Sequence, residues 1–479
     1  MNKNMYINGE WIESSNGKTK HVYNPANGNV VGSVPEGERK DVSKAIDAAD
    51  AAFDSWSKMT ASKRGDLIRK AYEILIDRSD QIAEILTMEQ GKPLAEAKGE
   101  VGAAAGFLHW YSEEAKRIYG ETIPASDPNK RLLVIKQPVG VVAAITPWNF
   151  PASMITRKIA PALAAGCTVI IKPANYTPLT AIALFEVFEE AGFPPGVINL
   201  VTGRGSEVGK EFVDNKKVKK ISFTGSTEVG KHLLRESSEQ VKRVSMELGG
   251  HAPFLVFEDA DIDEAVEACV TTKYRNAGQT CICTNRIYVQ DSIIESFSKR
   301  MAQRVSELKI GNGMEKNVDI GPLIDKEALK TSTDHVNDAI DKGATLVYGG
   351  KELSIDTLNG YFYEPTILKD VNDSMKVTYE ETFGPVAPLI SFSTEQEALQ
   401  KANNVNYGLA AYAFTNDLGR SYRIAEGLEY GIVGMNDPLP PAPQAPFGGW
   451  KESGLGQEGG HYGIEPFVEI KYISFKLNK

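Results

Sequence analysis

Cysteine is scarce in this chain, with only four among 479 residues. So few cysteines over this length cannot form a disulfide framework, and the pattern is typical of a protein of the reducing cytoplasm. The six histidines show no HxxxH spacing, so we expect no zinc site. The composition therefore predicts a cytoplasmic protein without a bound metal.

Long apolar runs and an excess of positive charge are also absent. No run approaches about 18 apolar residues, and no signal-like apolar segment follows Met1-Asn2-Lys3, which argues against membrane spanning and export. Acidic residues outnumber basic ones by 63 to 53, which gives a formal net charge of −10. Because no basic stripe interrupts this balance, nucleic acid is not an expected partner, and solubility alone explains the charge.

The middle of the chain alternates short apolar runs with amphipathic stretches. The runs that we interpret as strands cover 140–145, 168–171, 197–201, 220–223 and 244–246. The stretches with helical spacing cover 154–165, 179–191, 206–213 and 227–237. This alternation predicts an α/β fold with a doubly wound parallel sheet. A chain of this length is expected to form two or more domains.

A second series of strands and helices begins at Phe254, with apolar runs at 254–257, 286–289 and 389–392. It predicts a second α/β domain. Two further segments, 131–138 and 468–475, alternate apolar and polar residues and are predicted to leave these bodies as edge strands. Because unpaired edges tend to be covered, these segments suggest pairing between subunits.

Distinctive residues follow the five predicted strands of the first series. They are Asn149, Lys172, Gly203, Gly225-Ser226 and Glu247. Ligands of doubly wound sheets bind outside the carboxyl ends of the strands. We therefore predict a ligand site at this edge of the sheet.

Two of the four cysteines, Cys281 and Cys283, follow the polar turn Gly278-Gln279-Thr280. A thiol that only filled a core would need no polar, glycine-bearing turn before it, although a free cysteine is usually buried and inert. Together with the Glu247 carboxylate and the Asn149 amide, Cys281 would provide the nucleophile, base and donor of an acyl-transfer site. Each residue also has a structural alternative. Cys281 could be a buried core thiol, Glu247 one arm of an ion pair, and Asn149 a residue that shapes a turn.

The segment Thr224–Gly230 follows a strand and opens a helix. Gly225 permits a close backbone approach and the helix N-terminus attracts an anion, although an ordinary turn explains both. Lys172 either ends its strand in solvent or binds ribose hydroxyls or phosphate. Asn175 is an amide at a place where a carboxylate would bind a 2′-hydroxyl and repel a 2′-phosphate.

Six motifs, in order along the chain, resemble those of the NAD(P)-dependent aldehyde dehydrogenase superfamily. They are Pro147–Pro151, Phe223–Thr227, Glu247–Gly250, Gly278–Cys281, Glu380–Pro385 and Pro446–Gly449. The resemblance extends from Tyr6 to the C-terminal tail. It implies a dinucleotide-binding domain of residues 1–119 and 140–249, a catalytic domain of residues 250–450, and a small β oligomerisation element of residues 120–139 and 460–479. A homodimer or homotetramer is expected.

The resemblance also implies a role for each site residue. Cys281 matches the nucleophile that forms a thiohemiacetal and then a thioester with the aldehyde, Asn149 matches the oxyanion donor, and Glu247 matches the base that activates water. The residues that match cofactor contacts are Trp148, Lys172, Asn175, Gly225, Ser226, Glu381 and Phe383. Either NAD or NADP is the expected cofactor, because position 175 lacks the glutamate common in NAD-preferring members.

Within the superfamily the chain resembles the succinate-semialdehyde dehydrogenases most. Arg157 and Arg275 match arginines that bind the distal carboxylate of the substrate there, although each could instead form a structural ion pair. The loop 436–445 carries prolines where the subfamily has a serine that contacts this carboxylate. Succinic semialdehyde is thus the first expected substrate. The alternatives are 2-oxoglutarate semialdehyde, glycolaldehyde and lactaldehyde.

Two other functions fit parts of the sequence. An enzyme that passes the acyl group to coenzyme A would commonly lack a base at Glu247. A binding protein without catalysis would have no need to retain Cys281 together with Glu247 and Asn149. A further hypothesis is that Cys283 forms a reversible disulfide with Cys281 under oxidation, the alternative being a small buried side chain.

Overall fold

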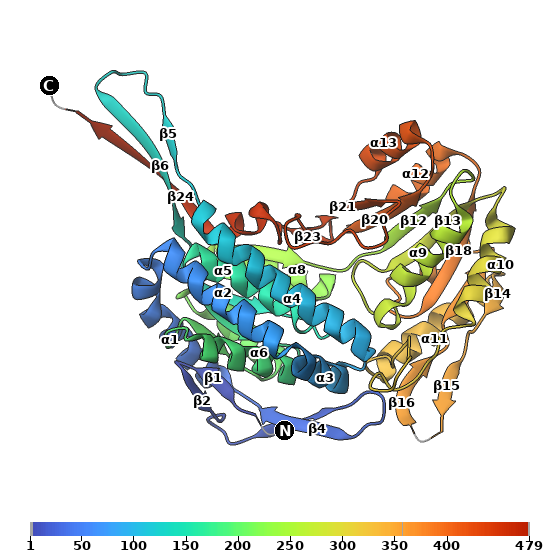
Figure 1. The fold of residues 1–479 in the computed structure, drawn as a ribbon, viewed down its shortest axis with the longest axis horizontal. Coiled ribbons are helices and arrows are strands. Elements are labelled where there is room, and N and C mark those ends of the chain that lie inside the picture. The colour runs from blue at the N-terminus through green and yellow to red at the C-terminus, as the bar shows by residue number, and fades with distance from the viewer. Residues whose placement is uncertain (1–2, 357, 478–479) are drawn as a thin grey trace.

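The computed structural model describes residues 3–356 and 358–477, which form two α/β bodies and a projecting β arm (Figure 1). The predicted dinucleotide-binding domain began at residue 1, the predicted catalytic domain includes residue 357, and the predicted tail segment ended at residue 479. Residues 1–2, 357 and 478–479 lie outside the described residues.

The first body contains an eight-stranded sheet with a parallel centre in the order β9-β8-β7-β10-β11. These strands are β7 (Val141–Ile145), β8 (Thr168–Lys172), β9 (Ile198–Leu200), β10 (Val218–Thr224) and β11 (Arg243–Glu247). The connecting helices are α5 (Ser153–Ala165), α6 (Pro178–Ala191), α7 (Gly205–Asp214) and α8 (Thr227–Ser237). The strand order reverses between β7 and β10, so the predicted doubly wound sheet is confirmed.

Antiparallel strands extend this sheet at both edges. At one edge lie β1 (Met5–Ile7) and β2 (Glu10–Ile12), joined by Asn8 and Gly9, whose φ angles of 55° and 82° suit a tight hairpin turn. At the other edge β23 (Gly454–Leu455) pairs with β11. The chain therefore returns to the first sheet after it has formed the second body.

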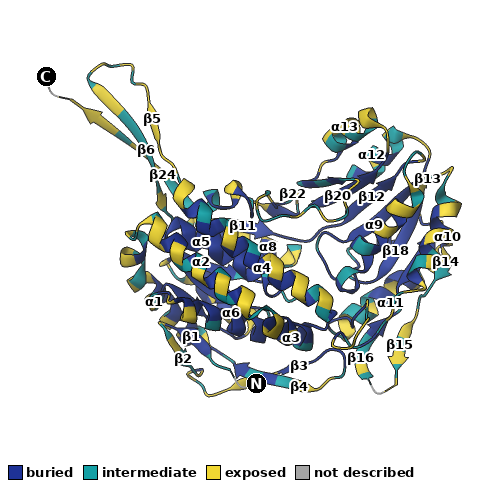
Figure 2. Cartoon of the chain, viewed as in Figure 1, coloured by how far each residue is buried: buried dark blue, intermediate teal, exposed yellow. Residues whose placement is uncertain are grey.

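Apolar side chains cover both faces of the first sheet, and its strands β8 and β9 are buried at every residue (Figure 2). On one face, Ala144 and Ile171 share a core with the helices α2 (Ala61–Asp77), α4 (Leu94–Glu114), α5 and α6. On the other, Ala143 and Ile170 share a core with α1 (Arg39–Ser57), α7 and α8. The helix α3 (Ser79–Gln90) precedes α4.

The second body has a seven-stranded sheet in the order β14-β17-β18-β13-β12-β20-β21, parallel except for β14. Its strands are β12 (Ala252–Val256), β13 (Thr284–Gln290), β14 (Thr345–Tyr348), β17 (Thr366–Lys369), β18 (Val386–Phe392), β20 (Ala410–Phe414) and β21 (Ile432–Met435). Its helices are α9 (Ile262–Tyr274), α10 (Ile294–Val305), α11 (Lys326–Asp341), α12 (Glu395–Asn403) and α13 (Leu418–Gly427). The predicted second α/β domain is present.

The arm is a three-stranded antiparallel sheet that stands away from both bodies (Figure 1). It consists of β5 (Glu121–Ile123), β6 (Lys130–Pro138) and β24 (Val468–Lys476). The two segments predicted as edge strands therefore pair with each other along their whole length. Smaller two-stranded pairs are β3 (Thr19–Tyr23) with β4 (Val30–Pro35), β15 (Glu352–Ile355) with β16 (Leu358–Tyr363), and β19 (Tyr407–Gly408) with β22 (Trp450–Lys451).

Candidate active site

The loop that carries Cys281 is joined to the first sheet by hydrogen bonds. Nδ2 of Asn149, four residues beyond the end of β7, donates to the carbonyl oxygen of Gln279 over 3.1 Å. The preceding turn needs Gly278, because its φ is +76° and a Cβ there would lie 2.2 Å from the carbonyl oxygen of Gly384. Asn149 and the Cys281 loop, which sequence analysis selected from distant parts of the chain, are thus brought together.

Cys281 opens into a cavity of about 390 Å³ between the two bodies. Its apolar wall comes from Phe150, Met154 and Phe447 and from the proline-rich loop, which contributes Leu439, Pro441, Ala442 and Pro443. Both predicted substrate arginines, Arg157 and Arg275, line the same cavity. A small molecule with an apolar middle and an anionic end would fit these walls.

The thiol of Cys281 is electrostatically disfavoured as a thiolate in this structure. Burial raises its pKa well above the usual value, and the nearby carboxylate of Glu247 adds to the shift. The guanidinium of Arg157 acts in the opposite direction. To act as the predicted nucleophile, Cys281 would need a neighbouring proton acceptor.

Glu247 ends β11 and is suited to accept that proton. Burial raises its pKa to about 7, although Arg157 opposes the shift. Its Oε2 lies 3.3 Å from Nη2 of Arg157, and its buried Oε1 has no hydrogen-bond partner among the described residues. A carboxylate with a pKa near 7 and one free oxygen is well matched to general-base work at neutral pH.

Arg157 is held by two carboxylates at once. Besides Glu247, its Nε lies 2.6 Å from Oε2 of Glu458, and its guanidinium stacks 4.1 Å from the ring centroid of Phe447. Glu458 also pairs with the buried Lys158. Burial opposes ionisation of Glu458, but Lys158 and Arg157 outweigh it and hold the pKa below its usual value.

Sequence reasoning missed Glu458 and Lys158. Glu458 lies 300 positions from Lys158 in the sequence and reaches it only through the returning C-terminal segment. Lys158 directly follows Arg157 on α5, but neither apolar spacing nor a motif marks a lysine whose side chain is completely buried. A run of two basic residues on an otherwise apolar helix was the only available signal.

Arg275 differs from Arg157 in having no ion pair among the described residues. Its guanidinium lies 5.0 Å from the ring centroid of Phe150, and the residue is partly exposed. Glu96, another residue that sequence reasoning missed, lines the cavity beside it. Burial raises the pKa of Glu96, while Lys92 and Arg275 oppose the shift.

A second group of predicted residues lies at the carboxyl ends of β8 and β10. The ammonium of Lys172, 5% exposed, donates to Oδ1 of Asn175 over 3.3 Å, and burial lowers its pKa to about 8. Ser226 is the N-cap of α8, where its Oγ accepts from the N–H of Val229 over 3.4 Å. Packing also requires glycine at position 225, because a Cβ there would lie 2.5 Å from the ring of Phe223.

Two cavities adjoin these strand ends. One, of about 370 Å³, is lined by Lys20, Asn175 and Arg204, among others. The other, of about 530 Å³, is a mainly apolar hollow between α7 and α8, where Val229 and Leu233 contribute to its wall. Both lie beside the strand ends that a bound ligand of a doubly wound sheet contacts.

The remaining predicted residues meet from both bodies. The rings of Trp148 and Phe383 pack edge to face with their centroids 5.6 Å apart. Oε1 of Glu381 accepts from the N–H of Gly250 over 3.3 Å, and burial raises the pKa of this carboxyl to about 8. Trp148 lies in the loop after β7, and Glu381 and Phe383 lie in the loop before β18.

Cys283 is fully buried, and its thiol faces away from solvent toward the carbonyl oxygen of Lys273 at 3.6 Å. All four cysteines are free in the structure. Burial raises the pKa of the Cys283 thiol. The predicted redox pairing of Cys281 and Cys283 stays a prediction.

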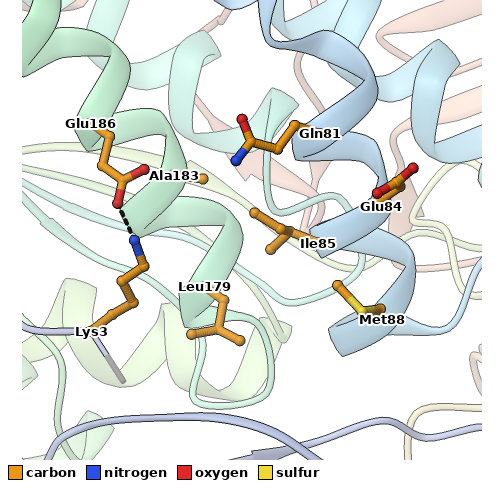
Figure 3. Close-up of a pocket in the computed structure, with 8 residues that line it drawn as sticks. All are labelled: Lys3, Gln81, Glu84, Ile85, Met88, Leu179, Ala183 and Glu186. Carbon is orange, nitrogen blue, oxygen red and sulfur yellow. Dashed lines mark hydrogen bonds and ion pairs between the residues drawn. The ribbon is translucent and has the colours of Figure 1, made fainter. Parts of the chain in front are cut away.

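Other features of the structure carry no part of the site. Figure 3 shows a small hollow between α3 and α6, where Lys3 pairs with Glu186 beside Ile85 and Leu179 and no thiol or buried charge is present. Among the described residues, no group of three or more His, Cys, Asp or Glu side chains could hold a metal ion. No helix of the described chain is long and apolar enough to cross a membrane.

The Cys281 thiol, the buried Glu247 carboxylate and the Asn149 amide are groups of the kind that covalent acyl chemistry needs. Residues 11–473 match the Aldehyde dehydrogenase family, and the chain belongs to this family. It is an oxidoreductase that acts on aldehydes.

Relatives of known activity match almost the whole chain. The chain is 53% identical to a glutarate-semialdehyde dehydrogenase of Pseudomonas putida, over 98% of this chain and 97% of that protein. It is 52% identical to the succinate-semialdehyde dehydrogenase [NADP(+)] of Escherichia coli, with the same coverage. It is also 50% identical to a 3-sulfolactaldehyde dehydrogenase of Pseudomonas putida, over 98% and 96%.

Solved structures agree with the fold. An aldehyde dehydrogenase of Brucella melitensis biovar abortus superposes with a TM-score of 0.98 at 52% identity, covering 100% of this chain and 98% of that one. A betaine aldehyde dehydrogenase of Staphylococcus aureus in complex with NAD+ superposes with a TM-score of 0.97 at 40% identity, covering 100% and 95%. The fold class predicted from the sequence is therefore confirmed.

Proposed function

We propose that the protein oxidises a small semialdehyde with a terminal carboxylate, succinic or glutaric semialdehyde, to the dicarboxylate, with NAD or NADP as the oxidant. The single observation that carries this proposal is Arg275, a guanidinium without an ion pair among the described residues that lines the same cavity as the Cys281 thiol. An unpaired cation beside a nucleophile is suited to an aldehyde that ends in an anion.

The shape of the cavity supports a short aliphatic substrate. Phe150, Met154 and Phe447 provide apolar walls for methylene groups, and the proline-rich loop offers no hydroxyl from Leu439 or Pro441. The relatives act on succinate semialdehyde, glutarate semialdehyde and 3-sulfolactaldehyde. Because these three substrates each carry an anionic group away from the aldehyde, an anionic tail is the property that the proposal transfers.

The residues at the strand ends fit a nicotinamide dinucleotide. The buried ammonium of Lys172 has one neutral partner, Asn175, among the described residues, and ribose hydroxyls would complete its hydrogen bonds. The N-terminus of α8 at Ser226 suits the pyrophosphate, and the apolar hollow between α7 and α8 suits the adenine. Trp148, Phe383 and Glu381 would contact the nicotinamide end.

Use of NADP is favoured by the charges around the 370 Å³ cavity. Lys20 and Arg204 line it together with the neutral Asn175, although Glu36 is also present. An anionic 2′-phosphate would meet Lys20 and Arg204, of which Arg204 pairs with Glu36 over 2.8 Å, and no carboxylate at position 175. We expect both cofactors to be used.

In the first half of the reaction, the Cys281 thiolate attacks the aldehyde carbon and a C–S bond forms. The π electron pair of the carbonyl moves to its oxygen, where Nδ2 of Asn149 and the backbone N–H of Cys281 would stabilise the negative charge. When bound, the oxidised nicotinamide accepts the hydride that leaves this carbon. The result on the enzyme is a thioester of Cys281.

In the second half, Glu247 takes a proton from water as the water oxygen attacks the thioester carbon. The C–S bond then breaks, and the electron pair returns to the Cys281 sulfur. Because Glu247 would be placed to activate water, hydrolysis is favoured over transfer to coenzyme A. The Cys281 thiolate is ready for another cycle once the carboxylate product leaves and Glu247 releases its proton to solvent.

We further propose a cytoplasmic homodimer or homotetramer that pairs through the arm. The outer strand β24 exposes three large apolar side chains, Ile470, Tyr472 and Phe475, with 69%, 58% and 48% exposure. Apolar side chains on a protruding strand tend to be covered by a partner.

The proposal is tested by kcat/KM over a panel of aldehydes with both cofactors in the parent and in Arg275→Met. The panel pairs succinic and glutaric semialdehyde with butanal and pentanal, which match them in length but lack the carboxylate. We expect the semialdehydes to be preferred, and Arg275→Met to raise their KM at least about tenfold, which corresponds to 1.4 kcal/mol of lost binding. A KM for butanal that changes equally would contradict the role of Arg275, and absence of turnover on the whole panel would contradict the proposed function.

A further inference from the structure

We propose that Asn276 is a positioning residue that holds the two oxyanion donors, Asn149 and the Cys281 backbone, in one fixed arrangement. The proposal rests on the oxidation chemistry proposed above and adds a residue to which no role has yet been given. Asn276 lies five residues before Cys281, in the turn between α9 and β13.

The side chain of Asn276 bridges the two parts of the oxyanion site. Its Nδ2 donates to the carbonyl oxygen of Asn149 over 3.1 Å and to that of Gln279 over 3.1 Å. The Gln279 carbonyl also accepts from Nδ2 of Asn149 over 3.1 Å. The main chain at Asn149 and the main chain before Cys281 therefore share one buried amide.

Further hydrogen bonds fix Asn276 itself. Oδ1 of Asn276 accepts from Nε2 of Gln90 over 2.9 Å, and its backbone N–H donates to Oε2 of Glu96 over 2.9 Å. On the other side of the same junction, Nζ of Lys92 donates to the carbonyl oxygen of Asn149 over 2.7 Å. Asn276 is 1% exposed, so bulk solvent does not compete for these contacts in the folded protein.

The backbone at Asn276 is held in a conformation that a side chain disfavours. Asn276 and Ala277 have φ angles of 51° and 55°, two consecutive non-glycine residues in the left-handed region. Such a conformation persists only where surrounding contacts enforce it. The conformational free energy that this turn costs is consistent with a turn that orients the segment after it. In that segment, Oε1 of Gln279 accepts from the N–H of Ile324 over 2.8 Å.

The consequence concerns the peptide N–H of Cys281. Fixing the Gln279 carbonyl fixes the plane of the Gln279–Thr280 peptide, and Cys281 is attached one peptide further along. Loss of the Asn276 side chain would free this segment and Asn149 relative to each other. Stabilisation of an oxyanion depends steeply on the placement of both donors, whereas simple access to the thiol does not.

The test compares a reaction that forms an oxyanion with one that does not, in Asn276→Ala and in a matched control. The first is the pre-steady-state burst of NAD(P)H with the best aldehyde, and the second is alkylation of Cys281 by iodoacetamide, which needs no aldehyde or cofactor. The control is Asn199→Ala, because Asn199 is also fully buried and its Nδ2 also donates to two backbone carbonyls, those of Gly196 and Val169, outside the site. Thermal unfolding of each variant shows whether it is folded.

We expect Asn276→Ala to slow the burst by about 10- to 100-fold, somewhat less than removal of a whole oxyanion donor, and to change the alkylation rate by less than about 3-fold. Asn199→Ala should change neither rate when folded. In an Asn149→Ala background, the effect of Asn276→Ala on the burst should shrink, because the two residues act as a unit.

Two outcomes would overturn the proposal. Equal slowing of the burst and of alkylation would show that Asn276 only keeps the Cys281 loop folded, and an unchanged burst would show that it positions nothing. If Asn276→Ala does not fold, Gln90→Ala, which removes only the contact to Oδ1 of Asn276, should give the same selective loss in smaller measure. Failure of the parent to turn over any aldehyde would instead contradict the proposed function and leave the alkylation rates as the separate readout.

Discussion

Nη2 of Arg157 lies 3.3 Å from Oε2 of Glu247, and both side chains are almost completely buried. This pair links a residue of the substrate cavity to the proposed general base. The cation of Arg157 lowers the pKa of Glu247, while burial raises it to about 7. The protonation state of the base therefore depends on a residue that the substrate carboxylate can also contact.

Replacement of Arg157 by Met should move the pH profile of turnover to higher pH. Glu247 must be ionised to act, so activity rises with pH through its pKa of about 7. Removal of the cation raises the pKa of Glu247 and also that of the Cys281 thiol, so both effects shift the rising limb in the alkaline direction. The measurement is kcat against pH with butanal. Because butanal has no carboxylate, the loss of Arg157 does not remove a contact to this substrate. Arg39→Met, which breaks a part-buried pair with Glu211 outside the site, should leave the profile in place.

Glu247→Gln should separate the two halves of the reaction. The amide cannot accept a proton, so thioester hydrolysis should slow by about 10²- to 10⁴-fold, the usual contribution of a general base. Formation of the thioester needs the Cys281 thiolate and a bound nicotinamide that would accept the hydride, but it needs no activated water. A burst of NAD(P)H close to one per site, followed by slow turnover, is expected in rapid-mixing measurements at high pH, where Cys281 ionises without help. A steady rate without a burst would argue that Glu247 acts before the thioester forms.

Asn175→Glu should favour NAD over NADP. A carboxylate at this position would repel a 2′-phosphate and could accept a hydrogen bond from a 2′-hydroxyl. We expect the ratio of kcat/KM for NADP to that for NAD to fall at least about tenfold, which is a difference of 1.4 kcal/mol. Asn175→Gln keeps a neutral amide and serves as the matched control. A ratio that falls equally in both variants would show that size, not charge, decides the preference.

Ile470→Lys should weaken the proposed assembly through the arm. Ile470 is 69% exposed on β24, and a charge placed there would oppose burial against a partner. Sedimentation velocity should show a smaller species than in the parent, with Lys471→Gln on the adjacent position as the control. A parent that sediments as a monomer would contradict the oligomer itself.

Cys283→Ala tests the hypothesis that Cys283 protects Cys281 under oxidation. If the two thiols form a disulfide, inactivation by peroxide should be reversed by dithiothreitol in the parent and become largely irreversible in Cys283→Ala. The burial of Cys283 and its contact with the carbonyl of Lys273 mean that the loop would have to move for the bond to form. Equal recovery in the two proteins would exclude Cys283 as the partner.

Much of the site could be predicted because its residues follow local rules. Lys172 and Glu247 each end an apolar strand, and Asn149 follows one after a short proline-flanked turn, so alternation of strands and helices was enough to place them at one edge of a sheet. Cys281 was marked by a polar, glycine-bearing turn, and the structure gives Gly278 the positive φ that such a turn needs.

Other features could not be predicted, because they depend on segments that meet only in three dimensions. Glu458 reaches Arg157 and Lys158 after a separation of some 300 residues, and β23 joins a sheet whose other strands end at residue 247. The two segments predicted to leave the bodies as edge strands, β6 and β24, pair with each other. No periodicity or local propensity encodes which distant partner a strand or carboxylate will find.

The helices, the strands and the types of reactive group follow from the amino-acid sequence, because apolar periodicity, turn residues and side-chain type are local properties of the chain. The tertiary structure decided the electrostatic state of those groups. Burial and the neighbours Arg157 and Glu458 set the pKa of Glu247 near 7, and only the fold brings these charges within a few ångströms of one another.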